Sequence, residues 1–91
     1  MNQVWTVRFH RQALKDLELC KRAGLGDKVR AMVQMISENP WENPPPYEKL
    51  VGNLVGLYSR RINRQHRMVY SVDEERRIIS ILALWTHYEH G

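Results

Sequence analysis

The residues between Tyr47 and Tyr70 include side chains that could catalyse the cleavage of a phosphodiester. Glu48 supplies a carboxylate in this stretch. Basic and imidazole groups follow at Arg60, Arg61, Arg64, His66 and Arg67, and the C-terminal segment adds His87 and Tyr88. A carboxylate can accept a proton, guanidinium groups can stabilise negative charge, and an imidazole can donate a proton. These residue types together favour acid–base chemistry that needs no metal ion.

A β-hairpin would position most of these side chains. Residues 57–62 and 66–72 have the composition of two strands, and the polar residues 63–65 form the expected turn between them. Symmetric closure of this turn places Arg61 opposite Arg67, where like charges repel by a few tenths to about 1 kcal/mol. A bound phosphate would relieve this repulsion, because guanidinium groups match phosphate oxygens in pairs.

Aromatic residues accompany the basic strands. The same closure pairs Tyr58 with Tyr70, and these rings, with Tyr88, offer surfaces on which unpaired bases could stack. The alternative is an ordinary solvated surface whose arginines pair with Glu74 or Glu75. Both interpretations stay open at this point.

Glu48 and His87 also have simpler explanations. A carboxylate after a proline-rich loop is commonly a surface group paired with Lys49 or an arginine, and a histidine near a C-terminus is commonly structural or solvated. None of the histidines has the spacing to cysteines or carboxylates that is typical of a metal site, and no glycine-rich phosphate loop is recognisable. We therefore expect neither a metal ion nor another cofactor.

The rest of the chain is expected to form the scaffold of an α+β domain. Apolar periodicity predicts a strand over 3–9, a helix over 11–21, and a second helix that Asp27 caps and Pro40 ends. The remaining expected elements are a proline-rich loop at 39–46, a short strand at 49–51, a turn at 52–56, the hairpin, and a strand over 77–85. This order predicts an N-terminal strand, a two-helix hairpin and an antiparallel meander of three to four strands packed on the helices.

Part of the core can be assigned in advance. The expected buried face of the first helix holds Ala13, Leu14, Leu17 and Cys20. Cys20 is interpreted as a buried apolar residue and not as a reactive thiol. Trp41 in the proline-rich loop is expected to pack on the core.

Composition narrows the class of protein. A chain of 91 residues that is 43% hydrophobic and 26% charged is expected to form one globular domain over residues 1–91. A net charge of +4 favours an acidic partner, with nucleic acid as the first candidate. The single cysteine excludes an internal disulfide, and neither a signal peptide nor a membrane-spanning run is recognisable. We therefore expect a cytoplasmic protein that does not enter a membrane.

Two blocks of the sequence resemble those of a known family. Residues 56–62, GLYSRRI, and 66–70, HRMVY, are similar to the G-aromatic-aromatic-S-R-R-I and H-R-L-V-Y blocks of the YoeB/Txe toxins. These toxins belong to bacterial type II toxin–antitoxin pairs in the RelE/ParE superfamily. The ending His87-Tyr88 matches the family's terminal H-Y, and the element order fits nearly the whole chain. The resemblance implies a RelE-like fold and a ribosome-dependent endoribonuclease, an mRNA interferase, that cuts mRNA and inhibits translation without a metal ion.

The resemblance also implies roles for individual residues. By position, Glu48 falls on the family's general base, Arg67 on its phosphate-stabilising arginine and His87 on its general acid. The family's paired arginines and its C-terminal tyrosine, both implied to contact the substrate, fall on Arg60, Arg61 and Tyr88.

This chain departs from the family at three places. Family sequences usually have proline, glutamate, proline, leucine and lysine where this chain has residues 47–51, YEKLV. Val51 therefore replaces a lysine, and Lys49 is its expected substitute in substrate binding. The segment between Arg67 and His87 is slightly longer than usual, and residues 89–91 extend beyond the usual end.

The implied reaction begins when Glu48 takes a proton from an RNA 2′-hydroxyl, which attacks the adjacent phosphorus. Arg67 stabilises the transition state and His87 protonates the leaving 5′-oxygen, which gives a 2′,3′-cyclic phosphate and a 5′-hydroxyl. Arg67 and His87 must then share a face of the sheet. A pairing such as Tyr70 opposite Ser80 would achieve this and a one-residue slip would not; the sequence leaves the register open.

The resemblance further implies a partner and suggests rivals. The partner is a cognate YefM/Phd-like antitoxin, whose acidic, partly disordered segment would fold over the basic groove; a homodimer is left open. One rival is a ParE-type toxin that inhibits DNA gyrase by binding, and another is a basic RNA-binding module without turnover. The co-occurrence of Glu48, Arg67 and His87 at matching positions argues against the gyrase inhibitor. Both rivals predict that Glu48→Ala leaves function largely intact, whereas the nuclease predicts a large loss.

Overall fold

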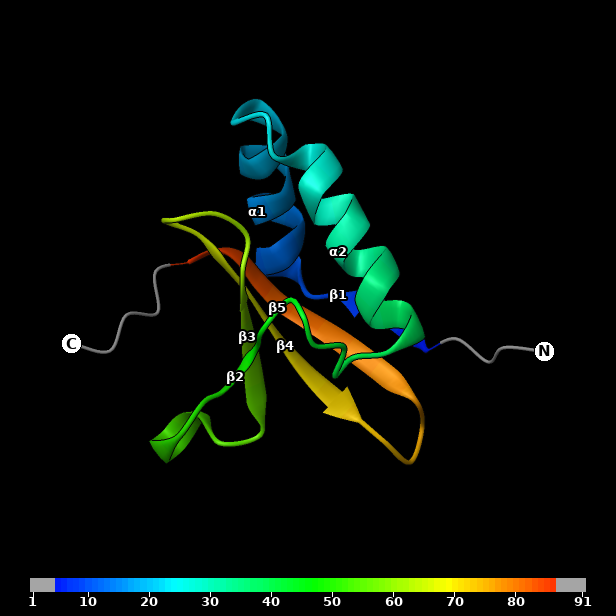
Figure 1. Ribbon diagram of the computed structural model, residues 1–91. Helices are drawn as coiled ribbons and strands as arrows, with labels where there is room; N and C mark the ends of the chain where they lie inside the picture. The colour runs from blue at the N-terminus through cyan, green and yellow to red at the C-terminus, as the bar shows by residue number, and fades with distance from the viewer. Residues whose placement is uncertain (1–4, 87–91) are drawn as a thin grey trace.

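The computed structural model describes residues 5–86, which form two helices and a five-stranded sheet (Figure 1). The elements are, in order, β1 (Thr6–Phe9), α1 (Arg11–Arg22), α2 (Gly26–Glu38), β2 (Glu48–Lys49), a 3-10 turn η1 (Gly52–Leu54), β3 (Leu57–Arg61), β4 (Arg67–Asp73) and β5 (Ile78–Thr86). The predicted α+β class and element order are confirmed. Neither helix of these residues is long and apolar enough to cross a membrane.

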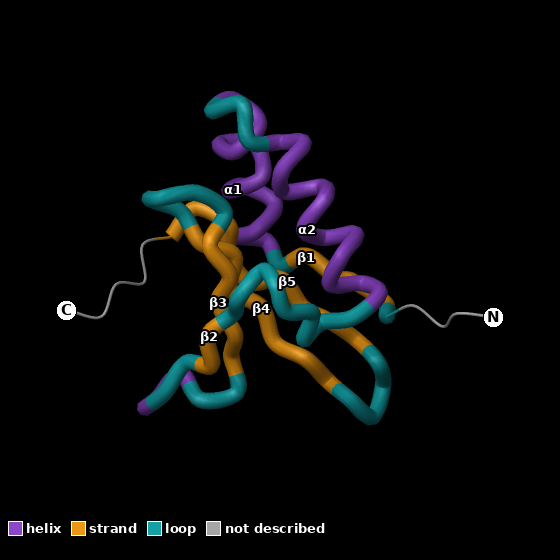
Figure 2. Tube along the Cα trace, in the orientation of Figure 1, coloured by secondary structure: helices purple, strands orange, loops and turns teal. Residues whose placement is uncertain are grey.

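The sheet has the strand order β1-β5-β4-β3-β2. Strand β1 runs parallel to β5, whereas the β5-β4, β4-β3 and β3-β2 pairs are antiparallel. Helices α1 and α2 form a hairpin that covers one face of the sheet (Figures 1 and 2). The short strand β2 lies at one edge, so most of β3 beyond it has no further strand beside it.

The helices pack on the sheet through a narrow apolar face. Val29, Met32 and Ile36 of α2 are buried, as the helical period predicts, and Cys20 of α1 is fully buried as expected. The expectation for Leu14 was wrong, because its side chain is 53% exposed. In the helical turn that contains Leu14, the buried side chain is instead a carboxylate, which hydrophobic periodicity could not predict.

That carboxylate belongs to Asp16, which is only 4% exposed. Its Oδ2 accepts hydrogen bonds from the backbone N–H groups of Leu84 at 2.9 Å and Trp85 at 3.2 Å, and its Oδ1 accepts one from Gln12. Burial, followed by the charge of Asp16, raises the pKa of the nearby Cys20 thiol above its usual value. Asp16 therefore ties α1 to the end of β5.

The β3–β4 hairpin closes as the sequence predicts. Arg61 lies opposite Arg67 and Tyr58 lies opposite Tyr70. The turn at 63–65 is stabilised by one of its own side chains. Asn63 Oδ1 accepts hydrogen bonds from the backbone N–H groups of Gln65 at 2.9 Å and His66 at 2.7 Å.

The β4–β5 register differs from the pairing considered from the sequence. Tyr70 lies opposite Ile81 and not opposite Ser80. Two irregularities then shift the pairing, one between Tyr70 and Val69 and one between Val69 and Arg67, so that Arg67 lies opposite Thr86. The shift between Val69 and Arg67 spans Leu84 and Trp85, whose backbone N–H groups Asp16 binds. A side-chain acceptor from another element cannot be predicted from the rules for hairpin pairing.

Several helix and strand boundaries differ from those predicted from the sequence. Helix α2 begins at Gly26 after Leu25, so Asp27 is not the N-cap and instead bonds to Arg30 at 3.1 Å. The short strand predicted at 49–51 is Glu48–Lys49, and the first strand begins at Thr6 within the described residues. Trp41 packs against the core as expected, with its ring edge-on to Trp5 at 5.6 Å.

Candidate active site

Glu48 and Arg67 are in direct contact. The Arg67 Nη1 group donates to Glu48 Oε1 at 2.7 Å and to Ser59 Oγ at 3.2 Å. The Arg67 side chain is 18% exposed and that of Glu48 is 60% exposed. The predicted base and the predicted phosphate-stabilising arginine are therefore brought together, although they stand 19 residues apart in the chain.

Three adjacent strands position this contact. Glu48 of β2 lies opposite Ser59 of β3, and Arg61 of β3 lies opposite Arg67 of β4. Ser59 and Arg61 are two residues apart on one strand, and directly opposed residues share a face. All four side chains consequently project from the same face of the sheet, at its β2 edge.

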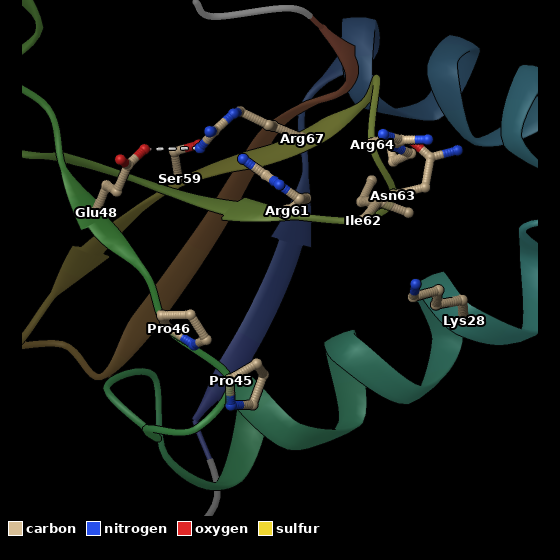
Figure 3. Close-up of a pocket in the computed structure, with 10 residues that line it drawn as sticks. All are labelled: Lys28, Pro45, Pro46, Glu48, Ser59, Arg61, Ile62, Asn63, Arg64 and Arg67. Atoms are coloured by element: carbon tan, nitrogen blue, oxygen red, sulfur yellow. Dashed lines mark hydrogen bonds and ion pairs between the residues drawn. The ribbon is translucent and has the colours of Figure 1, made fainter.

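A pocket of about 590 Å³ opens beside these residues (Figure 3). Its lining joins the sheet edge to the proline-rich loop, the β3–β4 turn and helix α2. The residues that line it are Lys28, Pro45, Pro46, Glu48, Ser59, Arg61, Ile62, Asn63, Arg64 and Arg67. Four of these residues carry positive charge and one carries negative charge, so the pocket is suited to bind an anion.

Arg60, which was expected to contact substrate, has a different environment. It is 1% exposed, and its guanidinium donates to the carbonyl oxygens of Pro40, Glu42 and Pro45 at 3.1, 2.8 and 2.6 Å. It also donates to the Tyr70 hydroxyl at 3.0 Å and lies over the Tyr47 ring, whose centroid is 4.9 Å from its Cζ. The expected substrate contact is corrected here: Arg60 fastens the proline-rich loop to the sheet and has no exposed guanidinium to offer.

The expected stacking surface at Tyr58 and Tyr70 is also corrected. Tyr70 is fully buried, and its hydroxyl donates to the Pro40 carbonyl at 2.9 Å. Burial raises the pKa of Tyr70, and the neighbouring charge of Arg60 opposes that shift. Tyr58 is half-buried and its ring stacks on Tyr70 with centroids 5.7 Å apart, so these rings belong to the support of the loop.

Two further residues lie outside the pocket. Lys49 is exposed and follows Glu48 on β2, so strand alternation directs its side chain to the opposite face. His66 is 6% exposed and stacks on Trp85 with ring centroids 3.7 Å apart. Neither residue is among those that line the pocket.

The predicted general acid His87 and the predicted substrate contact Tyr88 lie outside the described residues. The nearest described residue is Thr86, whose backbone pairs with that of Arg67. This pairing is not of the kind that the sequence analysis required for Arg67 and His87 to share a face of the sheet, and the role of His87 stays a prediction.

Sequence reasoning missed Ser59, Lys28 and the proline wall of the pocket. Ser59 stands inside the block GLYSRRI, where strand alternation could have placed it on the face of Arg61. Lys28 had no signal in the sequence, because α2 reaches the pocket only through the packing of the helices on the sheet.

Comparison with known proteins identifies the family. The family model described as YoeB-like toxin of bacterial type II toxin–antitoxin system matches residues 9–88. Toxin YoeB of Escherichia coli (strain K12) is 34% identical over 88 residues, which cover 97% of this chain and 100% of that protein. The chain therefore belongs to the YoeB-like toxin family.

Solved structures agree with this assignment and confirm the predicted fold. The YoeB/ParE toxin from Agrobacterium tumefaciens has a TM-score of 0.82 at 25% identity, covering 91% of this chain and 99% of that one. YoeB from Staphylococcus aureus, solved as a dimer, has a TM-score of 0.79 at 34% identity, covering 94% of this chain and 100% of that one. The S. aureus toxin has also been solved in a heterotetrameric complex with YefM.

Proposed function

We propose that this toxin is a ribosome-dependent endoribonuclease that cleaves mRNA by acid–base catalysis and so inhibits translation in the cytoplasm. The observation that carries the proposal is the contact between Glu48 Oε1 and Arg67 Nη1 at 2.7 Å, within an otherwise basic pocket. The activity is assigned to one domain, residues 1–91, and family membership supports it.

The contact suits a protein whose substrate has not yet bound. An ion pair with one partner 60% exposed contributes little to stability, so a phosphate can displace it. When a phosphodiester takes the place of the carboxylate on Arg67, Glu48 is released as a free base beside it. Arg61, opposite Arg67 and exposed, is available to bind the same phosphate.

The proposed reaction is a transesterification. Glu48 accepts the proton of the 2′-hydroxyl, and the 2′-oxygen forms a bond to phosphorus. Arg67 and Arg61 stabilise the additional negative charge of the pentavalent transition state. The bond from phosphorus to the 5′-oxygen breaks, and His87 supplies the proton to that oxygen. The products are a 2′,3′-cyclic phosphate and a 5′-hydroxyl.

The toxin is proposed to be held inactive by an antitoxin of the YefM type. The complex of the S. aureus relative with YefM supports this partner, and the dimer of that relative supports self-association as a second assembly. An acidic antitoxin segment would compete with RNA phosphates for Arg61 and Arg67 in the pocket.

Primer extension on an mRNA in a reconstituted translation reaction tests the proposal. The wild-type protein is expected to give discrete breaks that depend on translating ribosomes. Glu48→Gln and His87→Ala are each expected to slow cleavage by about 10²–10⁴-fold, because each loses one proton-transfer step. Arg67→Gln is expected to slow it by about 10²–10³-fold through loss of charge stabilisation.

Arg76→Gln is the matched control, since Arg76 lies in the exposed turn between β4 and β5, and we expect wild-type rates for it. All variants should unfold at the wild-type temperature. Full activity of Glu48→Gln, or products that carry a 5′-phosphate, would refute the mechanism. Growth inhibition without any cleavage of mRNA would favour a ParE-type toxin that binds DNA gyrase.

A further inference from the structure

The pocket continues well beyond the Glu48–Arg67 contact. Figure 3 shows Glu48, Ser59 and Arg67 at one end of the pocket, and Arg64 and Lys28 toward the other end, where Ile62 and Asn63 lie beside Arg64. A volume of about 590 Å³ lies within the range that accommodates a whole small-molecule ligand, so the pocket is larger than one phosphate group requires. The space at the far end, beside Lys28 and Arg64, is therefore available for a second group of the ligand.

The far end is basic and lacks acidic partners. Among the described residues, neither Lys28 nor Arg64 makes an ion pair with an acidic side chain. The neighbouring Arg30 behaves differently, since it pairs with Asp27 at 3.1 Å on the same helix. Two cations from separate elements thus face one cavity without compensation.

Their placement is unfavourable without a ligand. Lys28 stands in the first turn of α2, where the helix dipole repels a positive charge and attracts an anion. Arg64 stands at the tip of the turn that Asn63 Oδ1 fixes through its bonds to the N–H groups of Gln65 and His66. The anchored turn holds the backbone of Arg64 beside the pocket, and its exposed side chain is among those that line it.

We propose that Lys28 and Arg64 form a second phosphate subsite, which binds a phosphate of the mRNA strand adjacent to the one that is cleaved. The scissile phosphate lies at Arg61 and Arg67, and the strand then continues along the pocket to the far end. This inference rests on the proposed function, because it assigns the same RNA strand to both ends of the pocket. Phosphates of ribosomal RNA are the other source of this chemistry.

The test measures binding and cleavage on ribosomes programmed with four versions of one mRNA. The scissile nucleotide is either a ribonucleotide or a 2′-deoxynucleotide that cannot be cleaved. The adjacent phosphate is either native or a neutral methylphosphonate. The wild-type protein is compared with the double variant Lys28→Gln/Arg64→Gln, and with Lys15→Gln/Arg76→Gln, a control that removes two exposed charges elsewhere.

The double variant is expected to bind the native mRNA about tenfold more weakly than the wild type does. The methylphosphonate should weaken wild-type binding to a similar degree, and the double variant should lose nothing further on the neutral strand. Cleavage of the native mRNA at limiting toxin concentration should fall in proportion to this loss of binding. The control variant should bind as the wild type does.

Independent losses from the double variant and from the methylphosphonate would overturn the inference and assign the two cations to ribosomal RNA. Unchanged binding of mRNA by the double variant would also overturn the inference. If the double variant then bound only the antitoxin more weakly, Lys28 and Arg64 would be assigned to that partner. Because the 2′-deoxynucleotide strand cannot be cleaved, binding to it tests the phosphate subsite independently of the proposed nuclease activity. Coupled losses in binding without cleavage of the ribonucleotide strand would retain the subsite and refute the nuclease.

Discussion

Two neighbouring arginines of β3 have opposite environments. Arg60 is 1% exposed and donates four hydrogen bonds to neutral oxygens, whereas Arg61 is exposed and lines the pocket. Alternation along the strand separates them, because successive side chains point to opposite faces. A buried guanidinium without a carboxylate partner is costly unless its donors are satisfied, and here the carbonyl groups of the proline-rich loop satisfy them.

Replacing Arg60 by methionine is expected to lower the free energy of unfolding by about 2–4 kcal/mol. The reason is that the carbonyl groups of Glu42 and Pro45 lose the Arg60 donor, the Pro40 carbonyl keeps only the Tyr70 hydroxyl, and the loop loses its attachment to the sheet. Arg60→Lys should lose nearly as much, since one ammonium group cannot reach acceptors spread along the loop. Urea denaturation followed by tryptophan fluorescence measures both effects.

Arg61→Met is the matched control for stability, with an expected change below about 0.5 kcal/mol because its side chain is exposed. The same variant should lose cleavage activity, which separates the support of the loop from contact with substrate. Equal destabilisation by the two substitutions would show that Arg60 does not fasten the loop.

At the scale of elements, the end of β5 is held by helix α1. The N–H groups of Leu84 and Trp85 lie where the β4–β5 pairing shifts, and Asp16 Oδ2 accepts from both. Thr86 follows directly and pairs with Arg67, and His87 is the next residue in the sequence. The contact thus fixes the strand from which the proposed general acid extends.

Replacing Asp16 by alanine is expected to lower the free energy of unfolding by about 2–4 kcal/mol, because two backbone donors are left unpaired. The maximal cleavage rate at a temperature where the variant is fully folded should also fall, while binding of an uncleavable mRNA should change little. Denaturation curves, single-turnover cleavage and binding measurements give the three values.

Glu18→Ala provides the control on the same helix, since Glu18 makes only an exposed contact with Lys21 at 3.4 Å. We expect it to change stability by less than about 0.5 kcal/mol and to leave the cleavage rate unaltered. A rate for Asp16→Ala equal to that of the wild type would show that α1 has no influence on the catalytic end of β5.

At the scale of the whole molecule, charge is distributed unevenly. The chain carries a net charge of +4, and several of its cations surround the pocket at the β2 edge of the sheet. Among residues 5–86, large apolar side chains are exposed on α1 at Leu14 and Leu19 and around η1 at Val51 and Val55, and these four residues do not line the pocket. Electrostatic and apolar docking of an antitoxin would consequently use different surfaces.

The complex with an acidic antitoxin is expected to weaken by about tenfold or more when NaCl is raised from roughly 0.05 to 0.5 M, because salt screens exposed charges over short distances. Titration calorimetry at several salt concentrations measures this dependence. The variant Arg61→Gln/Arg64→Gln should show a much shallower dependence than Lys15→Gln/Arg76→Gln. Affinity that does not change with salt would contradict this prediction and favour docking on the apolar residues of α1 and η1.

Much of the candidate site could be predicted from the sequence, and the failures have physical causes. The pairing of Arg61 with Arg67 follows from the short turn at 63–65, which is a local feature of the sequence, and Glu48 was assigned through the family resemblance. All three residues line one pocket. Arg60 was expected beside Arg61, and its burial depends on carbonyl groups that stand 15 to 20 residues earlier in the chain. Lys28 reaches the pocket from α2, and no spacing in the sequence links it to β3.

The order of the elements, the closure of the β3–β4 hairpin and the family could all be predicted before the fold was known, because they depend on periodicity, turn residues and short motifs. The β4–β5 register, the burial of Asp16 and the burial of Arg60 beside an exposed Arg61 depend on the packing of the helices and the proline-rich loop on the sheet. Each of these results depends on a hydrogen bond between distant segments, such as the 2.9 Å contact of Leu84 N–H with Asp16. A buried donor must find its acceptor wherever the fold places one, and that partner is defined only when the helices pack on the sheet.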